Sequence, residues 1–472
     1  MAVTKRRMKV KSNYSFPARS KRLVFLLLPT RLSVFLFRRF IDDNRERNAL
    51  EAAKFLVDAN RIYATRYGRL IPKFLRFCLY LADLGLPKDY EKLVIESIWA
   101  THQNPKLRKQ VNEKVLHATS QLSQSDSTAQ GWKLLTLALN GFGFIRAGTI
   151  ARTNCLHAAL NEVKSNIASH RTRNLAIRGM LERRMFFEAF DTAHSLNIDR
   201  RVEPEAKATQ EYIALLTLNN SNFMIQTETK ERDRRLRDLV MNRNVALVAT
   251  GSDNNEHGLE IDNHQIVARV KFQGHQAMPD VEFAGRRCDV TFYTEDLVHR
   301  LANFGLYSPT KIDFLDGVKY VVIKKKATDS IGKTPTITLD GWAPTFLTTA
   351  TSGTLFLFEL VRNSPSEIKL FSFDFYTKRQ TYNSAVLNTF KTTPALKEVG
   401  LPINWFEFSS DQKESANITA GYINHDPKSD FLLIKNLYEL SGLIDGTPEV
   451  LALLNLTADE YDLKLEEMLG DW

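Results

Sequence analysis

The spacing of apolar residues changes near residues 225–240, and this change restricts the possible folds more than any other feature. From about 45 to 220, apolar residues recur every three or four positions and glycine and proline are sparse, which is typical of consecutive helices. Beyond the change, short β-rich runs alternate with helical patterns, which favours a mainly parallel, Rossmann-like sheet. The sequence therefore predicts an α/β domain over 240–472, preceded by an all-α domain over 45–225.

The second half of the chain contains the patterns expected of buried strands and amphipathic helices. We expect strands at Val245–Thr250, Ile266–Val270, Val290–Tyr293, Tyr320–Ile323 and Ile368–Phe373. We expect helices at Thr354–Arg362 and Lys428–Leu440. A charge-dense run over 226–237 separates these elements from the helical region, and it places the boundary between the two domains.

Two segments of the helical region resemble each other at an offset of about 42 residues. The residues Leu135, Leu139, Phe144, Ala147 and Ala151 correspond to Ile177, Leu181, Phe186, Ala189 and Ala193. Small residues where two helices cross, with an aromatic residue at the turn, predict helix-turn-helix repeats of the tetratricopeptide kind. An irregular helical bundle is the alternative. Repeats of this kind would offer a surface to a protein partner.

The composition is that of a globular protein and points to anionic partners. Of the 472 residues, 43% are hydrophobic and 25% are charged, and the formal net charge is +10. This charge favours nucleotide sugars, acidic glycans or lipid head groups. Nucleic acid is not an expected partner, because no recognised nucleic-acid-binding motif accompanies the charge. The three cysteines share no metal-binding spacing, which indicates a reducing compartment.

Residues 1–44 form a basic, amphiphilic segment, in which Lys and Arg are the only charged residues before Asp42. Its apolar run, Leu23–Phe37, is shorter than the roughly 20 residues of a membrane span and is interrupted by Pro29 and Arg31. No small-residue cleavage site follows it. We therefore expect the segment to lie on an anionic membrane surface. The alternative is a helix that packs on the rest of the protein.

The first chemical motif follows the strand predicted at Val245–Thr250. Gly251 lets the backbone approach a phosphate closely, and the hydroxyl groups of Thr250 and Ser252 can donate hydrogen bonds to it. The turn leads to a string, Glu260–Arg269, that contains an aspartate, a histidine and an arginine. In an open parallel sheet, ligands bind beyond the carboxyl ends of the strands, where this turn lies.

Two further motifs come later in the chain. The first is a hydroxyl-glycine turn at the start of a predicted helix, where free N–H groups and the helix dipole favour an anion. Its residues are Thr351, Ser352, Gly353 and Thr354. In the second motif, Asp426 and Pro427 are typical of an N-cap and a first helical residue, so His425 projects just before a helix.

Together these strings resemble, in the same order, the large, small and last motifs of the sialyltransferases, glycosyltransferase family 29. Ile261, Asp262, His264, Val267 and Arg269 match the large motif. The resemblance covers roughly residues 243–437. It implies the sialyltransferase variant of the A-type glycosyltransferase fold. We interpret Asp262, His264 and Arg269 as a buried polar framework and not as catalysts.

The resemblance also implies roles for individual residues. Thr250 stands roughly where the family has a phosphate-contacting asparagine, and Lys271, in place of the motif's final asparagine, could hold a phosphate or carboxylate. His425 takes the position of the family's general base. Asp430 replaces the glutamate of the last motif and would orient His425. The turn at 250–252 and the helix start at 351–354 would hold the phosphate of the donor.

The implied activity is inverting transfer of sialic acid or Kdo from a CMP-sugar to a bacterial surface glycan or glycolipid. No D-x-D triad occurs in the second half of the sequence, so we expect neither a metal nor another cofactor. The cysteines that form the family's disulfide have no counterpart here, which suits a cytoplasmic bacterial member peripheral to the inner face of the membrane. The alternative is a non-catalytic, membrane-associated scaffold of a glycan assembly complex, with a degenerate transferase domain.

Overall fold

The computed structural model describes most of the chain between residues 86 and 470. The described residues are 86–195, 203–216, 231–251, 256–272, 274, 281–294, 315–323, 330–331, 334–339, 343–378 and 425–470. Among them, no helix is both long and apolar enough to cross a membrane. The N-terminal segment 1–44 lies outside these residues, so its contact with a membrane stays a prediction. Ser252 of the first motif also lies outside them.

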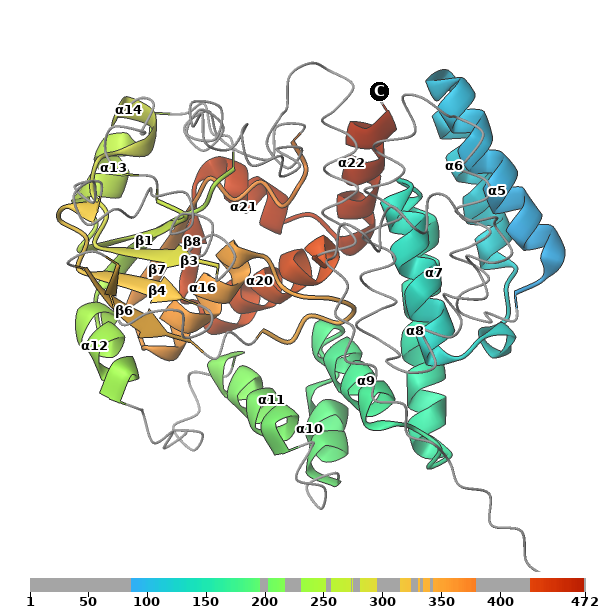
Figure 1. Cartoon of the computed structure of the whole chain (residues 1–472), viewed down its shortest axis with the longest axis horizontal. Coiled ribbons are helices and arrows are strands. Elements are labelled where there is room, and N and C mark those ends of the chain that lie inside the picture. The colour runs from blue at the N-terminus through green and yellow to red at the C-terminus, as the bar shows by residue number, and fades with distance from the viewer. Residues whose placement is uncertain are drawn as a thin grey trace, which may run out of the picture.

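A parallel sheet forms the centre of the second half (Figure 1). Its order is β5-β6-β4-β3-β2-β1-β7-β8, and every pairing among the described strands is parallel except the β5–β6 edge pair. The strands are β1 (Asn244–Val248), β2 (Ile266–Val270), β3 (Val290–Tyr293), β4 (Tyr320–Ile323), β5 (Ser330–Ile331), β6 (Thr334–Thr338), β7 (Glu367–Phe371) and β8 (Ile444–Gly446). The expected Rossmann-like parallel sheet is confirmed.

The inner strands are apolar on both faces because helices cover both sides of the sheet. Alternate residues of β1 point to opposite faces. Val245 and Leu247 belong to the main core, together with Phe356 of helix α16 (Ser352–Arg362). Ala246 and Val248 pack instead with Ile261 of α13 (Gly258–Asn263). Further helices around the sheet are α12 (Glu231–Val240), α14 (Val281–Ala284), α20 (Pro427–Ser441), α21 (Pro448–Leu454) and α22 (Ala458–Gly470).

The two segments that resemble each other in sequence form two helix pairs. The first pair is α7 (Ala129–Gly141) and α8 (Ile145–Lys164), and the second is α9 (His170–Glu182) and α10 (Phe186–Ser195). Nearly all of the corresponding apolar residues are buried at the helix contacts. The other helical elements before the sheet are α5 (Lys88–Gln103), η1 (Pro105–Leu107), α6 (Arg108–Ser120), η2 (Gln124–Asp126) and α11 (Glu203–Leu216).

The helical region contacts the end of the chain directly. In Figure 1, α20 and α22 lie between the sheet and helices α7 and α8. Thr149 of α8 donates a hydrogen bond to the carboxylate of Asp462 in α22, at 2.7 Å. Arg146, one turn earlier in α8, pairs with Glu466, one turn later in α22, at 2.6 Å. The two halves of the sequence therefore share a polar interface, and the C-terminal helices fill it.

Candidate functional site

The site lies where the strand order reverses. From β1 the chain proceeds outward through β2, β3, β4 and β6, and it then returns to the other side of β1 as β7. Ligands of open α/β sheets bind beyond the carboxyl ends of the strands at such a point. A pocket enclosing about 640 Å³ of empty space, including its open mouth, lies there. It is lined by Thr250, Gly251, Val270, Lys271, Thr351, Ser352, Gly353, Phe373, Asp374, Phe375, Tyr376, His425, Pro427 and Asp430.

Thr250 and Gly251 follow the carboxyl end of β1, as the first motif predicted. Gly251 is required by close packing: a Cβ atom there would lie 2.3 Å from the carbonyl oxygen of Ser372 and 3.2 Å from the carboxylate of Asp374. The glycine therefore admits the turn after β7. Lys271 follows β2 in a left-handed conformation, with φ 56°. Only a few per cent of non-glycine residues adopt this conformation.

The hydroxyl-glycine turn forms the start of α16, as expected. Thr351 is the N-cap, and its hydroxyl accepts a hydrogen bond from the backbone N–H of Thr354. The carboxyl group of Asp430 already contacts this helix start, because it accepts a hydrogen bond from the Thr351 N–H at 3.0 Å. The next two N–H groups in the first turn belong to Ser352 and Gly353, which line the pocket.

Asp430 belongs to the first turn of α20 and is almost fully buried. Burial raises the pKa of its carboxyl group to about 7, although hydrogen bonds from Thr351 and Thr354 act in the opposite direction. We expected Asp430 to orient His425. Its hydrogen bonds connect α20 to the start of α16 instead, because the short aspartate side chain faces the cap of the neighbouring helix.

His425 lies immediately before α20, half-buried at the pocket. Asp426 is the N-cap of this helix and Pro427 its first residue, as predicted. His425 is held by Thr349, with which it forms a parallel β-bridge. Its Nδ1 atom lies 3.3 Å from the Thr349 carbonyl oxygen. Since a carbonyl group only accepts hydrogen bonds, Nδ1 carries the proton in this contact, and the lone pair of the neutral ring is on Nε2.

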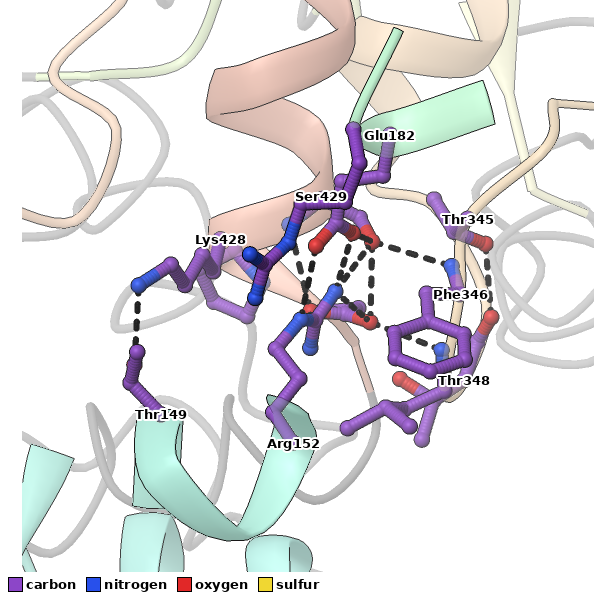
Figure 2. A network of polar contacts seen from close by, with 12 residues as sticks. Thr149, Arg152, Glu182, Thr345, Phe346, Thr348, Lys428 and Ser429 are labelled. Atoms are coloured by element: carbon purple, nitrogen blue, oxygen red, sulfur yellow. Dashed lines mark hydrogen bonds and ion pairs between the residues drawn. The ribbon is translucent and has the colours of Figure 1, made fainter. Parts of the chain in front are cut away.

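A buried ionic network fixes the loop that carries His425 (Figure 2). Arg152 of α8 is 2% exposed, and its guanidinium group contacts both Asp426 oxygens, at 2.9 and 3.0 Å. The same group also contacts Glu182 of α9 and the hydroxyl of Ser429. Burial would lower the pKa of Arg152, but the charges of Asp426 and Glu182 outweigh it and raise this pKa.

The network extends to the segment that precedes α16. The backbone N–H of Leu347 donates to Asp426 at 2.8 Å, and that of Phe346 donates to Ser429 at 2.9 Å. Arg152 also stacks over the Phe346 ring, 4.9 Å from its centre. Figure 2 shows these groups converging from α8, α9, α20 and the 345–348 segment. The helical region thus contacts the residue next to His425.

The large-motif residues form a polar framework, of which Arg269 is buried as expected, whereas Asp262 and His264 are only half-buried. Asp262 accepts hydrogen bonds from the backbone N–H groups of Arg286 and Arg287. The buried Arg269 donates to two carbonyl oxygens, those of Arg287 and Ala284. His264 contacts the Glu260 carbonyl oxygen at 2.8 Å and packs edge-on against Phe371. These residues hold the 284–287 loop against α13 and β2.

Asp374 is a pocket residue that the sequence analysis did not single out. It follows the carboxyl end of β7 and is 9% exposed. Burial raises the pKa of its carboxyl group to about 7. Its position in the sequence could have identified it, because it directly follows a predicted strand beside the switch point. An ionisable residue at such a position is a candidate for a functional site.

No family model matches the chain, and no curated protein matches it. The class of the protein is defined by its own fold and pocket: it is a Rossmann-like α/β protein with a cleft at the switch point of its sheet.

Proposed function

We propose that the protein is an inverting glycosyltransferase that transfers sialic acid or Kdo from a CMP-sugar to a hydroxyl group of a bacterial surface glycan or glycolipid. One observation carries the proposal. Three segments that are far apart in the sequence, Thr250–Gly251, Thr351–Gly353 and His425–Asp430, line a single pocket at the switch point. Each had been selected from the sequence for a motif of CMP-sugar transferases, and their convergence supports a shared ligand.

The reaction is a direct displacement at the anomeric carbon. The acceptor oxygen forms a bond to this carbon, and the bond from the carbon to the phosphate oxygen of CMP breaks, leaving its electron pair on the phosphate. His425 accepts the proton of the acceptor hydroxyl on Nε2. The contact between Nδ1 and the Thr349 carbonyl supports this role, because it selects the tautomer with a basic Nε2.

The departing phosphate carries negative charge that the pocket must accommodate. The first-turn N–H groups of α16 at Ser352 and Gly353 favour an anion, and Lys271 supplies a positive charge on the neighbouring strand end. Asp374 and Asp430 would repel phosphate if both were ionised. Because burial raises both pKa values to about 7, each carboxyl group is substantially protonated near neutral pH, and this reduces the repulsion.

The test is a donor screen with the purified full-length protein. CMP-sialic acid and CMP-Kdo are supplied separately with a glycan acceptor, and the release of CMP is followed. We expect one donor to give turnover. We also expect His425→Ala to lower kcat about 10²–10⁴-fold, because the general base is lost, while CMP affinity stays within a factor of about two. Near wild-type turnover by His425→Ala would remove His425 as the base. No release from either donor would favour the scaffold.

A further inference from the structure

Within the part of the chain that the structure describes, one oxygen atom of a buried carboxyl group in the pocket has no hydrogen-bond partner. Asp374 Oδ1 accepts a hydrogen bond from the backbone N–H of Tyr376 at 3.0 Å. Its Oδ2 atom is buried and has no partner in the described part of the chain. Buried polar atoms are nearly always paired, with protein, water or ligand. Since Asp374 lines the pocket, a ligand group can supply the missing hydrogen bond.

Aromatic side chains surround this carboxyl group. Phe373, Phe375 and Tyr376 line the same pocket. Phe375 and Tyr376 are both left-handed, with φ 47° and 63°, a conformation that is strained for residues other than glycine. The hydroxyl of Tyr461 in α22 holds this turn, because it donates to the Phe375 carbonyl at 2.7 Å. The turn thus presents a hydrogen-bonding group beside flat apolar surfaces, which suits the edge and face of an aromatic ring.

The ionisable groups around the pocket bear on the protonation of Asp374. Among the described residues they are Asp430 of α20, His425 before it, Lys271 after β2, Tyr376 in the same turn and Lys378 beyond the turn. Burial is the largest influence and raises the pKa of Asp374 to about 7, whereas Lys378 lowers it. In the protonated form, a carboxyl group presents one O–H donor beside one carbonyl acceptor. This pair matches a ligand edge that has an acceptor beside a donor.

We infer that Asp374 recognises the cytosine base of the nucleotide, pairing through its Oδ2 side with the exocyclic amino group and the adjacent ring nitrogen. The inference rests on the proposed function, because it assigns a subsite to the CMP-sugar donor. The exocyclic amino group of cytosine donates, and the ring nitrogen accepts. The hydrogen bond that Oδ1 accepts from the Tyr376 N–H favours Oδ1 as the carbonyl oxygen and places the proton on Oδ2. Uracil presents the opposite pattern to this fixed arrangement, so the subsite discriminates against UMP. Asp374 is more deeply buried than His425, which places the base inward and the reacting sugar towards His425.

The experiment is calorimetric titration of the full-length protein with CMP and with UMP, at pH 6 and pH 8. We expect the wild type to bind CMP at least about tenfold more tightly than UMP. The CMP affinity of the wild type should fall between pH 6 and pH 8. This fall should be roughly tenfold larger than the change in CMP affinity of Asp374→Asn over the same range. The amide of this variant has the same donor and acceptor arrangement as a protonated carboxyl group, so it should retain CMP affinity.

Asp374→Leu removes both groups and should weaken CMP binding roughly 10–100-fold, with little effect on UMP. Asp459→Asn, an exposed carboxyl group in the first turn of α22, is the matched control for loss of one charge and should bind like the wild type. If Asp374→Leu retains the preference for CMP, or Asp374→Asn retains the wild-type pH dependence, the inference is overturned while the proposed function stands. A wild type that binds neither nucleotide overturns both.

Discussion

At the scale of single residues, burial gives Asp374 and Asp430 a pH-dependent effect on stability. The folded protein binds their protons more tightly than the unfolded chain does, because both pKa values rise from 3.8 to about 7 on folding. The unfolded chain therefore binds fewer of these protons between about pH 4 and pH 7. The free energy of unfolding consequently falls as the pH rises through this window, and this contribution levels off above it.

Asp374→Asn should relieve this penalty. We expect the free energy of unfolding to rise at pH 8 by roughly 1–4 kcal/mol relative to the wild type, because the variant buries no charge. At pH 4, where the folded aspartate is protonated, the difference should nearly vanish. Urea unfolding at both pH values measures it, with Asp459→Asn as the exposed control. An equal difference at both pH values would show that Asp374 titrates normally in the folded protein.

At the scale of helices and strands, the elements around the site are coupled through buried ionic contacts. Arg152 of α8 connects Glu182 at the end of α9 to Asp426 at the start of α20. Burial opposes ionisation of Asp426, but the Arg152 guanidinium holds its pKa below the ordinary value. Removing the arginine would leave two carboxylates in the interior with their charges uncompensated.

Arg152→Ala should therefore lower the free energy of unfolding by about 3–5 kcal/mol, the range seen when one partner of a buried ion pair is removed. Arg146→Ala is the matched control on the same helix. Arg146 is partly exposed, so solvent screens its pairs with Glu113 and Glu466, and we expect a loss of about 1 kcal/mol. Chemical denaturation measures both variants. Equal losses would mean that burial of the Arg152 network adds nothing.

How well each element could be predicted depended on the range of the interactions that form it. The strands β2 and β3, which are fully buried, and β4, which is buried except at Tyr320, match their predicted bounds, because continuous apolar runs are typical of central parallel strands. Strand β6 was missed because it contains Pro335, a residue that is rare inside strands. Helix α13 was missed because six residues are too few to show a helical period.

The candidate site was predictable in part for the same reason. The cap residues Thr351 and Asp426 act within one helical turn, and both were predicted from local sequence. The contact between Arg152 and Asp426 joins residues 274 positions apart, and no local pattern signals it. Asp374 differs from a surface aspartate only through its burial, which arises from tertiary packing.

At the scale of the whole molecule, the helical region and the sheet form one polar interface, centred on the C-terminal helices. Lys428 of α20 and Thr149 of α8 both contact the buried Asp462 of α22. Arg184, in the turn after α9, pairs with Glu439 of α20. These contacts cross the boundary that the sequence places near 225–240. We infer that α20 and α22 depend on the helical region for their charge partners.

A fragment comprising residues 231–472 should therefore fold less stably than the full chain. It retains the sheet, but it exposes the faces of α20 and α22, and it removes Arg152, the ion-pair partner of Asp426, and Thr149, which donates a hydrogen bond to Asp462. We expect its thermal transition, followed by circular dichroism, to be broader and at least about 10 °C lower than that of the full protein. A cooperative transition at the full-length temperature would show instead that the sheet domain is independent.

The most direct test of the central claim is equilibrium binding of CMP to the full-length protein, measured by calorimetry in the presence of EDTA. Our account predicts saturable binding at one site per chain that the chelator does not change. Ser352→Ala, in the first turn of α16, should weaken it roughly three- to tenfold through loss of a hydroxyl contact, whereas the exposed Ser120→Ala should not. Absence of CMP binding, or binding that disappears with EDTA, would contradict the account.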